Sequence, residues 1–126
     1  MNVSMPSVSE GGNDKNVNNP FFPKPEEYQE VAIVNQTITI PKDSKGILIQ
    51  GNRVQQIIPE VGAENHQLVM VRAAPGYNTL IISQGVKMNT IYGTRDIYLR
   101  SQSNDFTILY PIDGQFYELL RGRYAD

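Results

Sequence analysis

The side chains able to do acid–base, nucleophilic or metal chemistry are few and scattered along this chain. There is one histidine, His66, and no cysteine, so thiolate metal sites, disulfides and cysteine nucleophiles are excluded. His66 lies in a polar stretch before an apolar run, and no Gly-x-Ser-x-Gly motif supplies a serine nucleophile. A zinc site built on one histidine and carboxylates would be a poor match for that metal. We therefore expect a surface histidine, no enzyme activity, no metal and no cofactor.

Three aspartates, Asp96, Asp105 and Asp113, recur at a spacing of roughly one strand each. Carboxylates on one edge of successive strands are an arrangement that glycoside hydrolysis uses. Each of the three, however, adjoins turn residues, and aspartate at a turn bonds to its own backbone. We interpret them as turn residues.

Composition excludes further classes of function. Hydrophobic residues make up 40% of the 126 residues, and the formal net charge is -2, which argues against a protein that binds nucleic acid through a basic face. Arg121 and Arg123 are interpreted as a solvated end. No apolar run approaches the roughly 20 residues that span a bilayer, and the first residues lack the pattern of a secretory signal. We expect a soluble protein made in a cytoplasm, without nucleic-acid or membrane partners.

From residue 31 onward the pattern is that of β-structure. Short β-branched or aromatic runs recur every 8 to 12 residues, with turn residues between them and no room for a helix of ordinary length. The predicted fold is all-β, a compact antiparallel β-sandwich or β-prism-like knob of short strands over residues 31–126. The expected strands lie at 31–34, 37–40, 47–50, 54–58, 68–72, 79–82, 86–88, 90–92, 97–100, 104–110 and 112–121, with an Asp-Gly turn at 113–114.

Several of these runs are apolar at consecutive positions, at 47–49, 68–71 and 80–82. Such strands need cover on both faces. One face is expected to pack on the domain's own core and the other on a partner, which favours an oligomer.

Residues 1–30 differ in kind, because Asn, Ser, Gly and Pro dominate and regular alternation is absent. We expect an extended or disordered N-terminal arm in the isolated protein. Pro25 and the acids after it are suited to a single helical turn. Two interpretations of the adjacent phenylalanines stay open: they cover the edge of the chain's own core, or they anchor the arm to another protein. The candidate anchor comprises Pro20, Phe21, Phe22, Pro23, Lys24 and Pro25.

The ending of the chain carries a family resemblance. Residues 106–110 read Phe-Thr-Ile-Leu-Tyr, and residues 113–119 read Asp-Gly-Gln-Phe-Tyr-Glu-Leu. Together with the order of runs from Ile38 to Arg121, this C-terminal segment resembles a small β-rich module of tailed-bacteriophage virion proteins, found in head fibres, capsid decoration proteins, tail fibres and spikes. Phe116 stands where that family more often shows Trp, and Pro111-Ile112 before the turn is unusual.

The resemblance implies a homotrimer displayed on the virion surface, with no catalytic residues. We expect a capsid decoration or head-fibre protein whose arm attaches to the major capsid protein or another virion component. The alternative is a receptor-recognition module of a tail fibre or spike that binds a host-surface glycan through tyrosines and the loops at 60–66 and 84–95. Residues expected to pack in the core or the trimer are Ile97, Leu99, Phe106, Ile108, Phe116, Tyr117 and Leu119.

Overall fold

The computed structural model describes residues 22–60, 67–87 and 95–123. These residues form strands and three short 3-10 segments, which confirms the all-β class. The strands are β1 (Tyr28–Ala32), β2 (Thr37–Ile40), β3 (Gly46–Gln50), β4 (Arg53–Val54), β5 (Gln56–Pro59), β6 (Val69–Ala73), β7 (Asn78–Ile81), β8 (Ile97–Arg100), β9 (Asp105–Ile112) and β10 (Gln115–Arg123). The 3-10 segments are η1 (Pro25–Glu27), η2 (Ser83–Gly85) and η3 (Ser101–Ser103).

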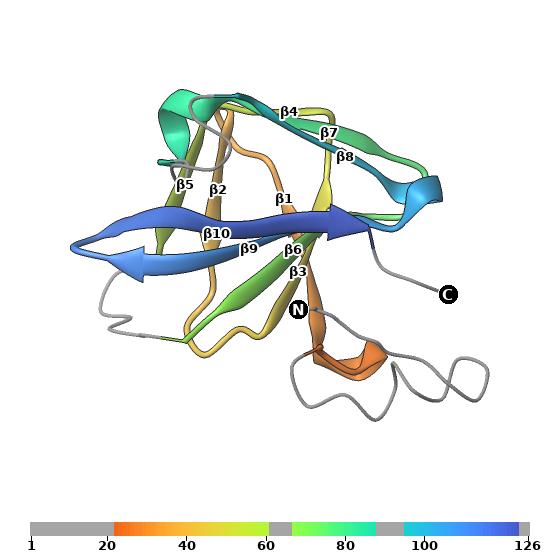
Figure 1. The fold of residues 1–126 in the computed structure, drawn as a ribbon, viewed down its shortest axis with the longest axis horizontal. Helices are drawn as coiled ribbons and strands as arrows, with labels where there is room; N and C mark the ends of the chain where they lie inside the picture. Colours follow the sequence, from red (N-terminus) through yellow and green to blue (C-terminus); the bar gives the residue numbers. More distant parts are fainter. Residues whose placement is uncertain (1–21, 61–66, 88–94, 124–126) are drawn as a thin grey trace.

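The strands belong to three sheets arranged around one interior (Figure 1). The largest has five strands in the order β1-β3-β6-β9-β10, the second pairs β2 with β5, and the third has the order β4-β7-β8. From β1 to β7, each strand belongs to a different sheet from the strand before it. Tyr28 in β1 pairs with Gly46 in β3, and Gly46 pairs with Met70 in β6, each after the chain has crossed another sheet. From β1 to β7 the chain therefore winds in successive turns, and the strands of each turn pair with strands of the turn before it.

The predicted antiparallel arrangement is wrong for the strand pairs between β1 and β7. The pairs β1–β3, β3–β6, β2–β5 and β4–β7 are parallel, whereas β6–β9, β9–β10 and β7–β8 are antiparallel. Parallel pairing requires a long crossover, and here each crossover consists of one or two strands of other sheets. The turns that contain Pro41, Gly51 and Gly76 therefore connect strands of different sheets.

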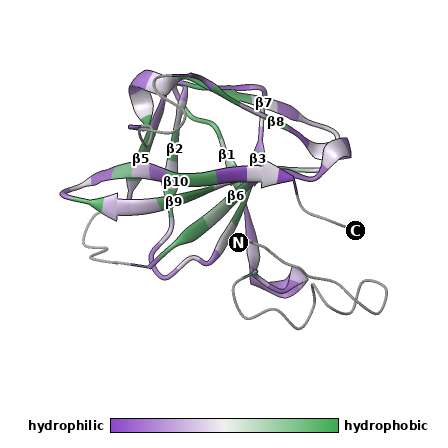
Figure 2. Ribbon diagram, in the orientation of Figure 1, coloured by the Kyte–Doolittle hydropathy of each residue, from purple (hydrophilic) through white to green (hydrophobic). Residues whose placement is uncertain are grey.

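One apolar core fills the interior, and strands of all three sheets contribute to it. Figure 2 shows hydrophobic colour concentrated in the strands and hydrophilic colour in the turns and 3-10 segments. Fully burying an aliphatic or aromatic side chain contributes about 1.5–3 kcal/mol, so this cluster is the main source of stability. Its buried members are Ile38, Ile40, Ile47, Ile49, Val54, Ile57, Val69, Val71, Ala73, Ile81, Val86, Ile97, Leu99, Leu109 and Phe116.

A second, smaller cluster lies on the other side of the five-stranded sheet, which we call the outer face. Met70, Phe106 and Ile108 are buried there, with Phe22, Tyr28 and Leu68 packed against them. The consecutive apolar residues of β6 are explained by this arrangement, since the central strand is covered on both faces. Part of the second face is covered by the chain's own N-terminal segment.

The β9–β10 hairpin confirms the predicted Asp-Gly turn. Asp113 has φ 51° and Gly114 φ 77°, and two central residues with positive φ are the requirement of a type I′ turn that matches strand twist. Farther along, the register shifts between Glu118 and Leu120, so that Leu119 forms a β-bulge.

The predicted boundary at residue 30 is too late. η1 supplies the expected single helical turn from Pro25, and β1 begins at Tyr28. The folded part includes Phe22 because its ring and that of Tyr28 pack on the outer face. The predicted strand at 86–88 is wrong for its described residues, because Val86 follows η2 directly and Lys87 makes an isolated bridge to Tyr117. Residues 1–21, positions 61–66 of the predicted loop and the predicted strand positions 88 and 90–92 lie outside the described residues.

Candidate functional site

The outer face of the five-stranded sheet is the surface that the N-terminal segment reaches. Strand register sets its side chains in rows. Tyr28, Gly46 and Met70 are paired neighbours in one row, which Ile108 continues, and Leu48 and Arg72 are paired in the next. Because strand side chains alternate between faces, these residues point away from the main core.

The Tyr28 side-chain ring lies against Gly46, its partner on the neighbouring strand β3. A Cβ placed on Gly46 would lie 2.6 Å from the Tyr28 ring and 3.0 Å from Pro23, so only glycine leaves room for both. The Tyr28 hydroxyl donates to the Met70 sulfur at 3.3 Å, and the Arg72 guanidinium lies 5.6 Å from the ring centroid. Burial raises the pKa of the Tyr28 phenol, although Arg72 acts in the opposite direction. Tyr28 thus fixes β1 and the segment before it to the sheet.

The segment before Tyr28 folds back over the same face. Pro23 is buried, and the half-buried Phe22 ring packs edge-on against Phe106, with centroids 6.0 Å apart and planes at 77°, a favourable aromatic geometry. The Glu27 side chain accepts from the Lys24 backbone N–H at 2.8 Å and pairs with Lys45 at 3.1 Å. The Lys24 and Lys45 hydrogen bonds lower the pKa of Glu27.

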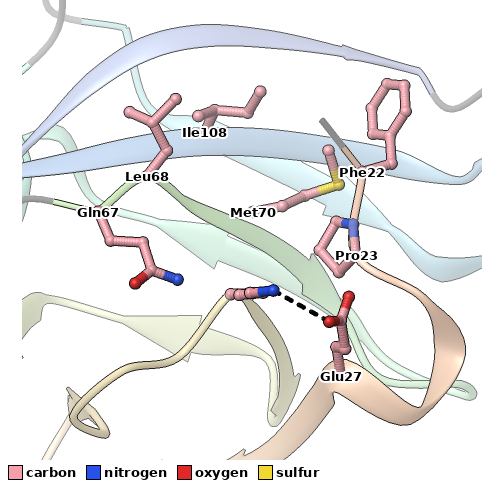
Figure 3. A pocket seen from close by; sticks show the side chains of 8 residues that line it. Phe22, Pro23, Glu27, Gln67, Leu68, Met70 and Ile108 are labelled. Atoms are coloured by element: carbon pink, nitrogen blue, oxygen red, sulfur yellow. Dashed lines mark hydrogen bonds and ion pairs between the residues drawn. The ribbon is translucent and has the colours of Figure 1, made fainter. Parts of the chain in front are cut away.

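Beside this segment the apolar face is open. Figure 3 shows Phe22 and Pro23 on one side of a hollow, Leu68 and Ile108 on the other, and the dashed Lys45–Glu27 pair at its rim. The hollow has a volume of about 300 Å³. The described residues that line it are Phe22, Pro23, Glu27, Lys45, Gln67, Leu68, Met70 and Ile108.

The residues of the predicted anchor lie in different environments. Phe22 and Pro23 pack on the chain's own sheet, which agrees with the interpretation that the aromatic rings cover the edge of the core. Lys24 and Pro25 are exposed. Pro20 and Phe21 lie outside the described residues.

A buried ionic cluster joins β10 to β9 and to the residues just before β8. Glu118 is completely buried, and its carboxylate accepts from the Thr107 hydroxyl at 2.5 Å and from Arg121 at 2.7 to 3.1 Å. Arg121 also donates to the backbone carbonyls of Asp96 at 2.9 Å and Arg95 at 3.3 Å. A buried charge is tolerated when it is paired and hydrogen-bonded in this way. The prediction that Arg121 belongs to a solvated end is wrong.

Asp105 is the centre of a second ionic cluster at the same end of the sheet. Its carboxylate accepts from the Arg100 backbone and side chain, each at 3.0 Å, and from Arg123 at 3.1 Å. Burial raises the pKa of Asp105, but these hydrogen bonds outweigh that effect and hold the pKa below its ordinary value. Asp105 therefore binds two arginines from other strands, beyond the turn role expected of it.

The other two aspartates do serve turns. Asp96 accepts from the Ser83 backbone N–H at 2.8 Å, at the start of η2, and Asp113 occupies the β-hairpin turn. Among the described residues no group of three potential metal ligands occurs, and no helix there is long and apolar enough to cross a membrane. His66 lies outside the described residues.

The predicted packing residues fall into three environments. Ile97, Leu99 and Phe116 are in the main core, and Phe106 and Ile108 are in the outer cluster. Tyr117 is half-buried, and Leu119, at the bulge, is 44% exposed.

Sequence reasoning missed the roles of Glu118, Thr107 and Arg72. Glu118 and Arg121 stand three positions apart, a spacing that places side chains on opposite faces of a regular strand. No glycine occurs at positions 118–120 to mark the bulge that changes this, so only the register of β9 with β10 reveals the pair.

Comparison of the chain with protein-family models, with curated proteins and with solved structures gave no match.

Proposed function

We propose that this chain is a structural protein of a tailed-bacteriophage virion, a homotrimeric capsid decoration or head-fibre protein attached through its N-terminal arm. The resemblance of residues 106–119 to the C-terminal segment of that family's module supports the assignment. The structural observation that carries it is the position of Phe22 and Pro23. They tie the start of the folded part to a rigid sheet beside an open apolar hollow.

Because Phe22 and Pro23 hold the base of the arm on the sheet, a force on an attached arm acts on the whole domain. Because Phe22 and Tyr28 pack on the sheet, tension on the arm is borne by the five-stranded sheet. Three arms in one trimer would raise the apparent affinity for a repetitive shell through effective concentration.

The proposed trimer contact is the β9–β10 hairpin. Three large apolar side chains are exposed on it: Leu119 (44%), Ile112 (42%) and Leu120 (38%). Apolar residues gathered on one element favour an association surface. Leu119 is the best placed, because the bulge leaves its side chain outside both apolar clusters.

Two measurements test the proposal. Light scattering after size exclusion should give three times the chain mass of 14.2 kDa, and a monomer would overturn the trimer. For attachment, the full chain and a chain lacking residues 1–21 are mixed with purified capsid shells and sedimented. This cut retains Phe22 and Tyr28, so the fold is kept. Loss of co-sedimentation is expected, and equal binding by the two chains would remove the arm from the proposal.

A further inference from the structure

A second hollow, which we call the arginine hollow, is lined by β8, the start of β9 and the end of β10. It shares no lining residue with the hollow in Figure 3. Its volume is about 390 Å³, within the range typical of small-ligand sites. The described residues that line it are Ile97, Tyr98, Leu99, Arg100, Asp105, Phe106, Arg121, Gly122 and Arg123.

Positive charge exceeds negative charge in the arginine hollow. Among its described lining residues three are arginines and one, Asp105, is an acid. Arg121 is neutralised by the buried Glu118, with Nη2 and Oε1 2.7 Å apart. Arg100 and Arg123, however, share the single carboxylate of Asp105. One positive charge is therefore left over, and it is complementary to an anionic ligand.

Asp105 holds the Arg100 and Arg123 guanidinium groups in place. Its Oδ2 accepts from Arg100 Nε at 3.0 Å, and its Oδ1 accepts from Arg123 Nε at 3.1 Å. The Asp105 side chain is 10% exposed, whereas those of Arg100 and Arg123 are 43% and 60% exposed. Among the described residues no hydrogen bond uses the Nη atoms of these two arginines. Their Nη donors are therefore preorganised by a buried carboxylate and accessible to a ligand, and preorganisation lowers the entropic cost of binding.

A tetrahedral oxyanion suits these donors better than a second carboxylate. Arginine binds phosphate groups through parallel N–H···O hydrogen bonds. A phosphate or sulfate ester presents three terminal oxygens, so it can accept from two guanidinium groups that approach from different directions. A carboxylate presents only two oxygens, and Asp105 already uses both of its own to join the two Nε atoms.

The aromatic lining indicates what the oxyanion is attached to. Tyr98 precedes Arg100 by two positions, so both side chains lie on the same face of β8, and Tyr98 is 52% exposed. Gly122 has no side chain to fill the space beside the Phe106 ring, which lies 3.2 Å from where a Cβ would be. Aromatic rings pack favourably on one another, so a ligand with a ring beside its oxyanion fits this surface.

We propose that the arginine hollow binds the phosphate or sulfate group of a ring-bearing ester. The Nη donors of Arg100 and Arg123 bind the oxyanion, and the Tyr98 ring contacts the ring of the ligand. The proposal goes beyond the attachment role and does not rest on it, since the hollow is formed within one chain.

Isothermal titration of the full chain with phenyl phosphate and with phenyl sulfate tests the proposal. Benzoate carries the same ring with a carboxylate, and inorganic phosphate carries the oxyanion without a ring. We expect saturable binding of at least one ester, at least tenfold tighter than that of benzoate, and the tighter of the two esters decides between phosphate and sulfate. No saturable binding of either ester at millimolar concentration would overturn the proposal, and so would equal binding of benzoate. Inorganic phosphate that binds as tightly as phenyl phosphate would overturn the role of the ring.

Variants place the binding in this hollow. Arg123→Gln should weaken ester binding at least tenfold, whereas Arg53→Gln, at an exposed arginine of β4, should leave it unchanged. Arg123→Lys keeps the charge but loses the paired Nη donors, so it should also weaken binding. Tyr98→Ala, at a side chain that is 52% exposed, should weaken binding of the phenyl esters and leave that of inorganic phosphate unchanged. Undiminished ester binding by Arg123→Gln or by Tyr98→Ala would contradict the site.

Discussion

Glu118 and Arg121 lie three residues apart on one strand, yet their side chains meet on the same face, with Arg121 Nη2 2.7 Å from Glu118 Oε1. The bulge at Leu119 makes this possible because the extra residue shifts the alternation by one position. Arg121 thereby reaches the backbone carbonyls of Arg95 and Asp96, just before β8. The ion pair and these carbonyl contacts connect β10, at the edge of the five-stranded sheet, to the segment before β8, at the edge of the three-stranded sheet. These two strands are not paired with each other.

Arg121→Met should destabilise the fold strongly. The substitution leaves the Glu118 carboxylate buried with the Thr107 hydroxyl as its remaining side-chain partner among the described contacts, and breaking a buried pair from one side costs about 3–5 kcal/mol. Because Arg121 is 21% exposed, the lower part of that range is expected. Urea unfolding at a fixed protein concentration measures the loss.

The matched control for Arg121 is Arg123→Met, since Arg123 is 60% exposed and a surface pair contributes about 1 kcal/mol or less. The double variant Glu118→Leu, Arg121→Met should recover much of the stability, because it removes both charges together. Equal losses for Arg121→Met and Arg123→Met would contradict the importance of the buried pair.

Asp105 should make the protein acid-sensitive. Its folded-state pKa lies below the ordinary value of 3.8, so its contribution to stability is present above about pH 4 and is lost as the pH falls through the folded-state pKa. Asp105→Asn should therefore be less stable than wild type at pH 7, by about 1 kcal/mol after allowance for the exposed arginines, and the difference should vanish at the lowest pH.

The pH test uses denaturant unfolding from pH 7 to pH 2. Glu27 also has a lowered pKa and loses stability in the same direction, so both proteins are compared in a Glu27→Gln background. Asp113→Asn, at the exposed hairpin turn, is the control with no arginine partner removed. A gap between Asp105→Asn and wild type that stays constant across this pH range would refute the assignment.

Gly46→Ala should detach the Tyr28 ring from the sheet. A methyl group 2.6 Å from the ring cannot be accommodated without movement, and overpacking of this kind costs about 1–3 kcal/mol. Hydrogen exchange should increase in 22–32 more than in β7 and β8. The double variant Gly46→Ala, Tyr28→Ala removes the clash, so the glycine substitution should cost much less in that background; an undiminished cost would show that the ring is not the obstacle.

Leu119→Glu should lower the oligomeric state while preserving the fold. Leu119 is 44% exposed and outside both apolar clusters, so the isolated chain loses little, whereas a charge in the proposed trimer contact is costly. Light scattering measures the mass. Val34→Glu is the matched control, because Val34 is also exposed, at 65%, and belongs to the β1–β2 connection and not to the β9–β10 hairpin. An unchanged mass for Leu119→Glu would exclude this hairpin as the contact.

The sequence by itself determined most of the strand positions and the Asp113-Gly114 turn, because β-branched runs and turn residues act within a few positions of the chain. It also indicated that the central strands need two covered faces. The tertiary structure alone decided which strands pair, since parallel partners such as Tyr28 and Gly46 are joined by passage through another sheet. It also decided that Phe22 covers the outer face and that a bulge brings Arg121 to Glu118. Those relationships arise from long-range register and packing, which no local pattern encodes.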